Sequence, residues 1–84
     1  MIKKLNNHPH AQCHVEIEPD RIVFVSYTTP VIIVKNYGGQ NFFECTGTYS
    51  QTTRKQIGYF LKEYFPYLNY YDMKAIVGMG EVGI

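Results

Sequence analysis

Hydrophobic positions follow two different spacings along the chain. In the first two thirds they form short alternating or continuous runs bounded by turn residues, which is typical of strands. Four runs fit this description: Cys13–Glu18, Ile22–Tyr27, Val31–Val34 and Phe42–Thr46. Pro19 and Asp20 predict a turn after the first run, and Gly38 and Gly39 predict one before the fourth. The pattern therefore predicts a four-stranded antiparallel sheet.

After a break near Gly47, the spacing becomes that of an amphipathic helix between Ser50 and Phe65. The hydrophobic stripe comprises Ile57, Phe60, Leu61, Tyr64 and later Leu68. Thr53 and Gln56 have the spacing of a capping box, and Ser50 and Thr52 are rival caps. Pro66 is expected to end this helix. Asn69–Tyr71 is expected to be a connector, and Asp72 to cap a short second helix through Val77.

The length of 84 residues leaves room for one domain. We expect a single small α+β domain over residues 1–84, in which the sheet is packed by one main C-terminal helix plus a short second helix. Residues 1–11 are expected to form a flexible arm, and residues 78–84 a Gly-rich apolar tail.

Charge and composition narrow the choice of partners. Eight basic and seven acidic residues give a net charge of +1, so no overall field attracts nucleic acid or a membrane. Two cysteines and no charged-then-apolar leader favour a reducing cytoplasm. The longest aliphatic run, Val31–Val34, is far shorter than the ~20 residues of a membrane span. We therefore expect a soluble cytoplasmic protein with no membrane partner.

Two motifs resemble ligand sites but lack the surroundings that such sites need. Gly78–Gly83 matches G-x-G-x-x-G, yet a dinucleotide site requires a helix to begin at the end of the motif, and only Ile84 follows. Zinc ligands usually come as two separated pairs. The ligand-type residues cluster instead in one segment: His8, His10, Cys13 and His14. We expect no cofactor and no metal, with a soft-metal site on this segment left open.

Hydroxyl side chains and two cations gather around the start of the predicted main helix. Arg54 and Lys55 would lie in its first turn, where the helix dipole disfavours cations by ~0.3–1 kcal/mol each. A bound anion would offset that cost. Ordinary capping with two solvated cations is the alternative. The candidate anion- or partner-binding residues here are Tyr49, Ser50, Thr52, Thr53, Arg54 and Lys55.

Tyrosine is abundant, with eight copies and no tryptophan. Its flat apolar ring and polar tip suit either the finish of a thin core or an adhesive surface. Along the helix and connector, an aromatic surface interleaved with Lys62 and Lys74 would comprise Tyr59, Tyr64, Phe65, Tyr67, Tyr70 and Tyr71. Helical phase assigns about half of these rings to the core. The candidate binding residues that remain are Tyr59, Lys62, Tyr70 and Tyr71.

Groups suited to catalysis are sparse. The histidines are confined to the N-terminal segment, and the carboxylates are scattered through turns and strand exteriors. Nucleophilic catalysis needs a nucleophile, a base and an orienting group together. We expect no enzyme, and a small ribonuclease that uses a histidine of the arm is the alternative.

Three segments carry a family resemblance: Thr29–Val34, Cys45–Lys55 and Asn69–Lys74. Over roughly residues 29–75 the chain resembles a family of uncharacterised small proteins of Gram-positive bacteria, their phages and mobile elements. The resemblance implies no activity and no catalytic residue. It implies a setting in which small proteins often inhibit host defence, as anti-CRISPR proteins do by binding a nuclease. The nearly neutral charge disfavours DNA mimicry.

Two functional hypotheses follow. The first is a protein-binding inhibitor from a phage or mobile element that contacts a host protein such as a CRISPR effector nuclease. The second is a small nucleic-acid-binding regulator that uses Thr52–Lys55 and exposed tyrosines. A homodimer is expected under both hypotheses, because a thin core and an apolar tail gain from a shared interface.

Overall fold

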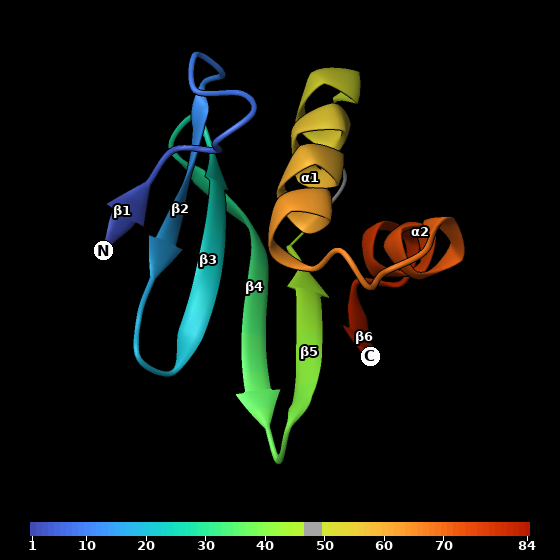
Figure 1. Cartoon of the computed structure of the whole chain (residues 1–84). Coiled ribbons are helices and arrows are strands. Elements are labelled where there is room, and N and C mark those ends of the chain that lie inside the picture. The colour runs from blue at the N-terminus through green and yellow to red at the C-terminus, as the bar shows by residue number, and fades with distance from the viewer. Residues whose placement is uncertain (47–49) are drawn as a thin grey trace.

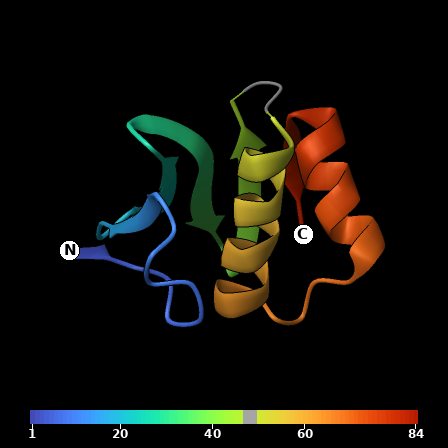
Figure 2. The ribbon, with the colours of Figure 1, turned by 90° about the horizontal axis from the view of Figure 1, so that it is seen from above.

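The computed structural model describes residues 1–46 and 50–84, and two helices cover one face of an antiparallel sheet (Figures 1 and 2). The elements in chain order are β1 (Ile2–Lys3), β2 (Cys13–Ile17), β3 (Arg21–Ser26), β4 (Thr29–Tyr37), β5 (Gln40–Cys45), α1 (Gln51–Tyr64), α2 (Tyr70–Met79) and β6 (Glu81–Gly83). Within the described residues the sheet has six strands, in the order of the chain. The predicted α+β class with two C-terminal helices is confirmed.

The prediction of four strands is wrong, because β1 and β6 extend the sheet at its two edges. The four predicted runs correspond to β2–β5. The two extra strands have only two and three residues. Segments of this length cannot display an alternation of hydrophobic and polar positions, so the sequence pattern carries no signal for them.

The N-terminal segment, which the sequence suggested to be a flexible arm, is held by contacts along its length. Ile2 pairs with Glu16 of β2, and the Leu5 side chain is fully buried in the core. The Asn6 amide donates to Glu63 Oε1 of α1 at 2.8 Å. One buried leucine among polar residues has no periodicity, so the pattern could not reveal this anchoring.

The C-terminal residues close the other edge of the sheet. Gly80 ends α2 with a φ of 84°, and its carbonyl accepts from the Cys45 amide at 2.6 Å. β6 then pairs with β5, and the Ile84 amide donates to the Asn41 carbonyl at 2.8 Å. The G-x-G-x-x-G segment thus runs from the end of a helix into a strand, which is the reverse of a dinucleotide-binding turn.

The structure shows which residue caps each helix. Ser50 caps α1, because its Oγ accepts from the Thr53 amide at 3.3 Å. Asn69 caps α2, and the side chain of Asp72 accepts from the Asn69 amide at 3.1 Å in a reciprocal capping box. The prediction that Asp72 is the cap is therefore wrong. Tyr70 and Tyr71 belong to the first turn of α2 and are not part of the connector.

The core lies between α1 and the middle of the sheet. The Phe60 ring of α1 stacks on Phe24 of β3, with ring centroids 4.7 Å apart. Phe65 packs edge-on against Phe43 of β5 at 4.9 Å. The predicted stripe on α1 is confirmed, since Ile57, Phe60 and Leu61 are buried there. Figure 2 shows α1 and α2 side by side on the same side of the sheet.

A chain of buried hydrogen bonds also joins α1 to β3. Ser26 Oγ donates to Gln56 Oε1 at 2.6 Å and lies 3.3 Å from Thr53 Oγ1. Since Ser26 has one hydroxyl proton, Thr53 must be the donor in the second contact. Ser50 Oγ donates to Thr53 Oγ1 at 3.4 Å, so the chain runs from the helix cap to the sheet. The three buried side chains satisfy one another.

We expect Ser26→Ala to lower the free energy of unfolding by about 1–3 kcal/mol, because the buried Gln56 carbonyl would lose its donor. Denaturant titration of both proteins measures the difference. Thr28→Ala, at an exposed turn position, is the control and should stay within about 0.5 kcal/mol of the wild type. A Ser26→Ala loss no larger than that of the control would contradict the role given to the buried chain.

Stability should also fall in alkali. Burial raises the pKa of the Cys13 thiol above its ordinary value of 9.0 and the pKa of the Tyr64 hydroxyl above its ordinary value of 10.0. The folded state therefore holds these protons more tightly, so their contribution is complete below about pH 9 and is lost as the pH rises through the raised values. Thermal unfolding measured from about pH 8 to about pH 11 should show a falling midpoint.

The double variant Cys13→Ala, Tyr64→Phe provides the control for this pH dependence. It removes both titrating groups, so its midpoint should fall less steeply over the same pH range. An equally steep fall in the double variant would assign the alkaline loss to other groups.

Candidate functional site

A groove of about 730 Å³ runs between α1 and α2. Each helix contributes one face to it, at positions three or four residues apart. The lining residues are Arg54, Ile57, Gly58, Leu61 and Lys62 from α1, and Tyr70, Met73, Lys74, Val77 and Gly78 from α2. The two walls, Arg54 to Lys62 and Tyr70 to Gly78, span the same number of residues.

The floor of the groove is apolar. Ile57 and Leu61 are almost fully buried beneath it, and the half-buried Met73 and Val77 pack against the core from the other helix. Met73 is the most adaptable of these side chains, because its unbranched thioether fills irregular spaces. The floor therefore presents a hydrophobic surface that can adjust to an apolar side chain placed on it.

Two glycines widen the groove. Gly58 lies inside α1 and Gly78 near the end of α2, and a Cβ built on either would meet nothing within 4 Å in the described part of the chain. Glycine inside a helix is less stable than alanine by about 0.5–1 kcal/mol. Because neither glycine is required by packing within the described residues, their effect is to leave space in the groove.

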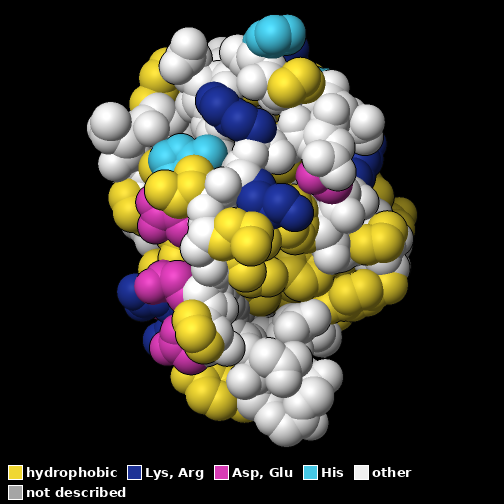
Figure 3. Space-filling model, turned by 60° about the vertical axis from the view of Figure 1, so that its left-hand side comes forward, with side chains coloured by type: hydrophobic (Ala, Val, Ile, Leu, Met, Phe, Trp, Pro, Cys, Tyr) yellow, Lys and Arg dark blue, Asp and Glu magenta, His cyan; other side chains and the backbone are white. Residues whose placement is uncertain are grey.

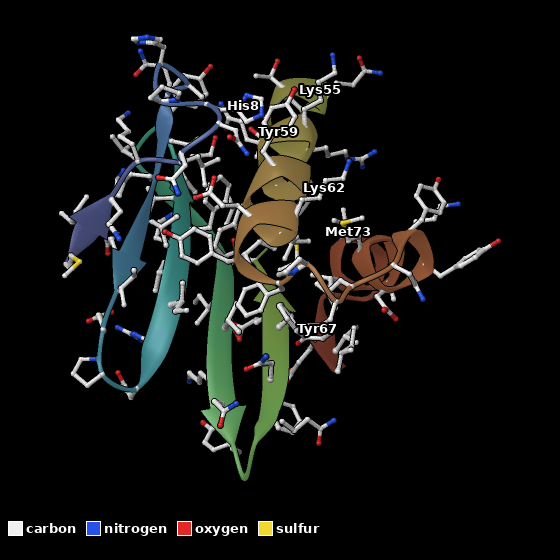
Figure 4. All side chains as sticks on the ribbon, in the orientation of Figure 1. His8, Lys55, Tyr59, Lys62, Tyr67 and Met73 are labelled. Atoms are coloured by element: carbon white, nitrogen blue, oxygen red, sulfur yellow. The ribbon has the colours of Figure 1, made fainter. Side chains whose placement is uncertain are left out.

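The charged side chains that line the groove are all cationic. They are Arg54, Lys62 and Lys74, and each is exposed. Lys74 Nζ also lies 5.6 Å from the centre of the Tyr70 ring, within the range of a cation–π contact. The groove thus has a local positive field that the net charge of +1 conceals. Figure 4 shows Lys62 and Met73 directed into the space between the two helices.

The predicted hydroxyl and cation patch at the start of α1 is only partly assembled. Thr53 is 7% exposed, and its hydroxyl belongs to the chain of buried hydrogen bonds between α1 and β3. Ser50 is engaged as the cap of α1. Thr52 and Lys55 are exposed, and Lys55 lies at the beginning of the helix (Figure 4). Arg54 points into the groove. Tyr49 lies outside the described residues.

The predicted aromatic surface is divided among several places. Phe65 is buried, and Tyr59 stacks on His8 with ring centroids 3.6 Å apart. The Tyr67 hydroxyl accepts from Asn41 Nδ2 at 2.9 Å near the C-terminal strand. Tyr70 and Tyr71 are 64% and 78% exposed at the start of α2. Of these tyrosines, Tyr70 is the one that borders the groove.

Three of the four N-terminal ligand-type side chains serve other contacts or are buried. His8 lies on the Tyr59 ring, and His14 Nε2 lies 3.1 Å from Glu16 Oε2. Cys13 is buried in the core, where desolvation raises the pKa of its thiol. Among the residues that the structure describes, no three His, Cys, Asp or Glu side chains are placed to hold a metal ion.

A second depression, of about 550 Å³, lies beside the β2–β3 turn. Its lining includes both positively and negatively charged side chains, and Arg21 Nε pairs with Glu18 Oε1 at 2.9 Å. Figure 3 shows the molecule with the β1 side brought forward, where hydrophobic side chains gather in the middle of the face and most of the acidic ones lie along one border. The groove between the helices is the better candidate site, because its field has one sign and its floor is apolar.

Sequence reasoning missed most of the α2 wall: Met73, Lys74, Val77 and Gly78 were not among the candidate site residues. The signal was the helical spacing of Tyr70, Lys74 and Gly78, which matches that of Arg54, Gly58 and Lys62 on α1. The prediction that α2 begins at Asp72 concealed this spacing, because it assigned Tyr70 to a connector and not to the helix.

Comparison with known proteins assigns a family but no activity. A model described as "Family of unknown function (DUF8033)" matches residues 3–71, and the chain therefore belongs to this family. The match runs from β1 through α1 to the first turn of α2. No curated protein and no solved structure matches the chain. Across residues 1–46 and 50–84, neither helix has the length and hydrophobicity to cross a membrane.

We expect Gly58→Ala to raise the free energy of unfolding by about 0.5–1 kcal/mol, because alanine favours the helix and its methyl group meets open space. Thermal or denaturant unfolding measures the change. Gly39→Ala, at a turn position with a φ of 85°, is the contrasting control and should be destabilising. A destabilised Gly58→Ala would show that the groove lacks the free space assigned to it.

Proposed function

We propose that this protein is a small non-enzymatic binding protein that acts through protein–protein contact at the groove between α1 and α2. The observation that carries the proposal is an open apolar floor whose bordering charges are all positive. Grooves between helices commonly bind amphipathic segments of partner proteins. Met73, exposed Tyr70 and Arg54 also belong to the residue types enriched at protein interfaces.

The partner we propose is a host-defence protein, such as a CRISPR effector nuclease, inhibited in the cytoplasm of a host cell. The family resemblance to proteins of phages and mobile elements supports this setting. The near-neutral charge supports contact with a protein surface over imitation of DNA. An inhibitor of this kind needs affinity and shape, and it needs no catalytic group of its own.

A nucleic-acid-binding regulator is the competing function, and the exposed rings beside Lys74 are the observation that favours it. Tyr70 and Tyr71 lie with ring centroids 5.8 Å apart at the start of α2. Bases stack on such rings while cations contact phosphates. Phosphate contacts make the affinity for nucleic acid fall steeply as salt rises, whereas the affinity of an apolar groove for a protein changes little over the same range.

Capture from a host lysate tests the proposed function. The tagged protein, after nuclease digestion of the lysate, should retain a protein partner at salt from about 50 to about 200 mM. Met73→Glu should abolish capture, since it places a charge on the apolar floor, and Lys74→Glu should reduce capture, since it reverses a cation beside the floor. Mass spectrometry of the retained material measures the result.

Ile2→Glu is the control variant for this capture. Ile2 is 70% exposed on β1, at the opposite edge of the sheet from α2. It should retain the same partner as the wild type. Recovery of nucleic acid alone from undigested lysate, or capture of a protein equally by Met73→Glu and the wild type, would overturn the proposed function.

A further inference from the structure

Resting on the proposed function, we infer that the groove binds an acidic amphipathic helix of the partner protein. Its two walls run from Arg54 to Lys62 and from Tyr70 to Gly78. At a rise of 1.5 Å per residue each wall is about 12 Å long, which is a little over two helical turns. A helix laid between them would meet the floor with two or three anchor side chains, at the spacing i, i+3 or i+4, and i+7.

The walls favour a helix over an extended strand. A strand binds mainly through backbone hydrogen bonds to an unpaired sheet edge. The groove lies instead between two helices, whose own hydrogen bonds occupy most backbone groups inside the wall segments. It therefore offers side-chain contacts, which a helix exploits by presenting one apolar face.

Gly58 and Gly78 set how closely the partner helix can approach. Both lie in the groove lining, and no atom of the described residues comes within 4 Å of where a Cβ would stand on either glycine. The missing side chains allow the backbone or the anchor side chains of the partner to reach the floor. The glycines thus lower the stability of the helices and leave space in the groove. This is expected of a surface that a partner covers and is not expected of one that only solvent contacts.

Charge complementarity identifies the partner helix as acidic. Arg54, Lys62 and Lys74 border the groove from both helices, and no carboxylate is among the lining residues. Arg54 also lies in the first turn of α1, which contains no acidic residue, and the helix dipole disfavours a cation there. Glutamates or aspartates flanking the apolar stripe of the partner would offset this term and pair with all three cations.

The direct test uses a fluorescein-labelled synthetic peptide of about 18 residues, with leucines on one helical face and glutamates elsewhere. Two companions serve as controls: the same peptide with every glutamate replaced by lysine, and one with the same composition but scrambled leucine positions. Fluorescence anisotropy with the full chain should show binding of the glutamate peptide. Both companions should bind at least about tenfold more weakly.

Gly58→Leu is the variant that blocks the floor without disturbing the fold. Leucine is a strong helix former, and the space above Gly58 is open. The variant should be at least as stable as the wild type and should bind the glutamate peptide at least about tenfold more weakly. The affinity of Gly58→Ala for the glutamate peptide should lie between those of the wild type and Gly58→Leu, because its added methyl group is small.

Reversing the rim charges tests the acidic character of the partner. The triple variant Arg54→Glu, Lys62→Glu, Lys74→Glu should bind the glutamate peptide about tenfold more weakly and the lysine peptide more tightly. The triple variant Lys3→Glu, Lys35→Glu, Lys55→Glu makes the same change in net charge at exposed positions outside the groove. It should leave both affinities within about twofold of the wild type.

The inference would be overturned by no binding of the glutamate peptide, equal binding of the three peptides, undiminished binding by Gly58→Leu, or equal effects of the two triple variants. Preferential binding of poly(U) RNA would overturn it and the proposed function together. A dimer in sedimentation experiments that Gly58→Leu dissociates would also overturn it, by making a second copy the occupant. Groove-dependent capture of a protein from lysate without peptide binding would leave the proposed function standing and remove the acidic helix alone.

Discussion

The buried hydrogen bonds between β3 and α1 fix where the main helix crosses the sheet. Ser26 donates to Gln56, and Thr53 joins that contact to the helix cap at Ser50. Sliding or rotating α1 would leave a buried hydroxyl or amide without a partner, whereas the hydrophobic contacts around Phe60 tolerate small shifts. The chain of hydrogen bonds therefore specifies the position of α1, and the hydrophobic core around Phe60 supplies the burial.

A helix held there cannot cover the whole sheet. It is about 10 Å across, whereas neighbouring strands are separated by about 4.8 Å, so it shields two or three strands. The β5–β6 side is left to α2, which contacts both of those strands. The two helices consequently lie side by side with little direct contact, and the groove between them follows from this division of the sheet.

The fold and the candidate site were predictable to different extents. Strands β2–β5 and the stripe on α1 were predictable, because their buried positions appear in the sequence as compact hydrophobic runs or as a helical period. The edge strands were not, since Ile2–Lys3 and Glu81–Gly83 are too short for any period and depend on pairing with strands already in place. Within the predicted patch at Thr52–Lys55, the sequence could not reveal that the Thr53 side chain is buried. A hydroxyl in the first turn of a helix looks the same in sequence whether it faces water or the core.

The central claim is that the partner contacts the groove. The most direct measurement is photo-crosslinking of the captured partner with benzoylphenylalanine placed at Tyr70, which borders the groove, or at Tyr37, in the β4–β5 hairpin. These tyrosines are 64% and 61% exposed, so their access to solvent is matched. We expect a crosslinked protein from position 70 and none from position 37. Crosslinking from position 37 alone would place the partner elsewhere and contradict the account.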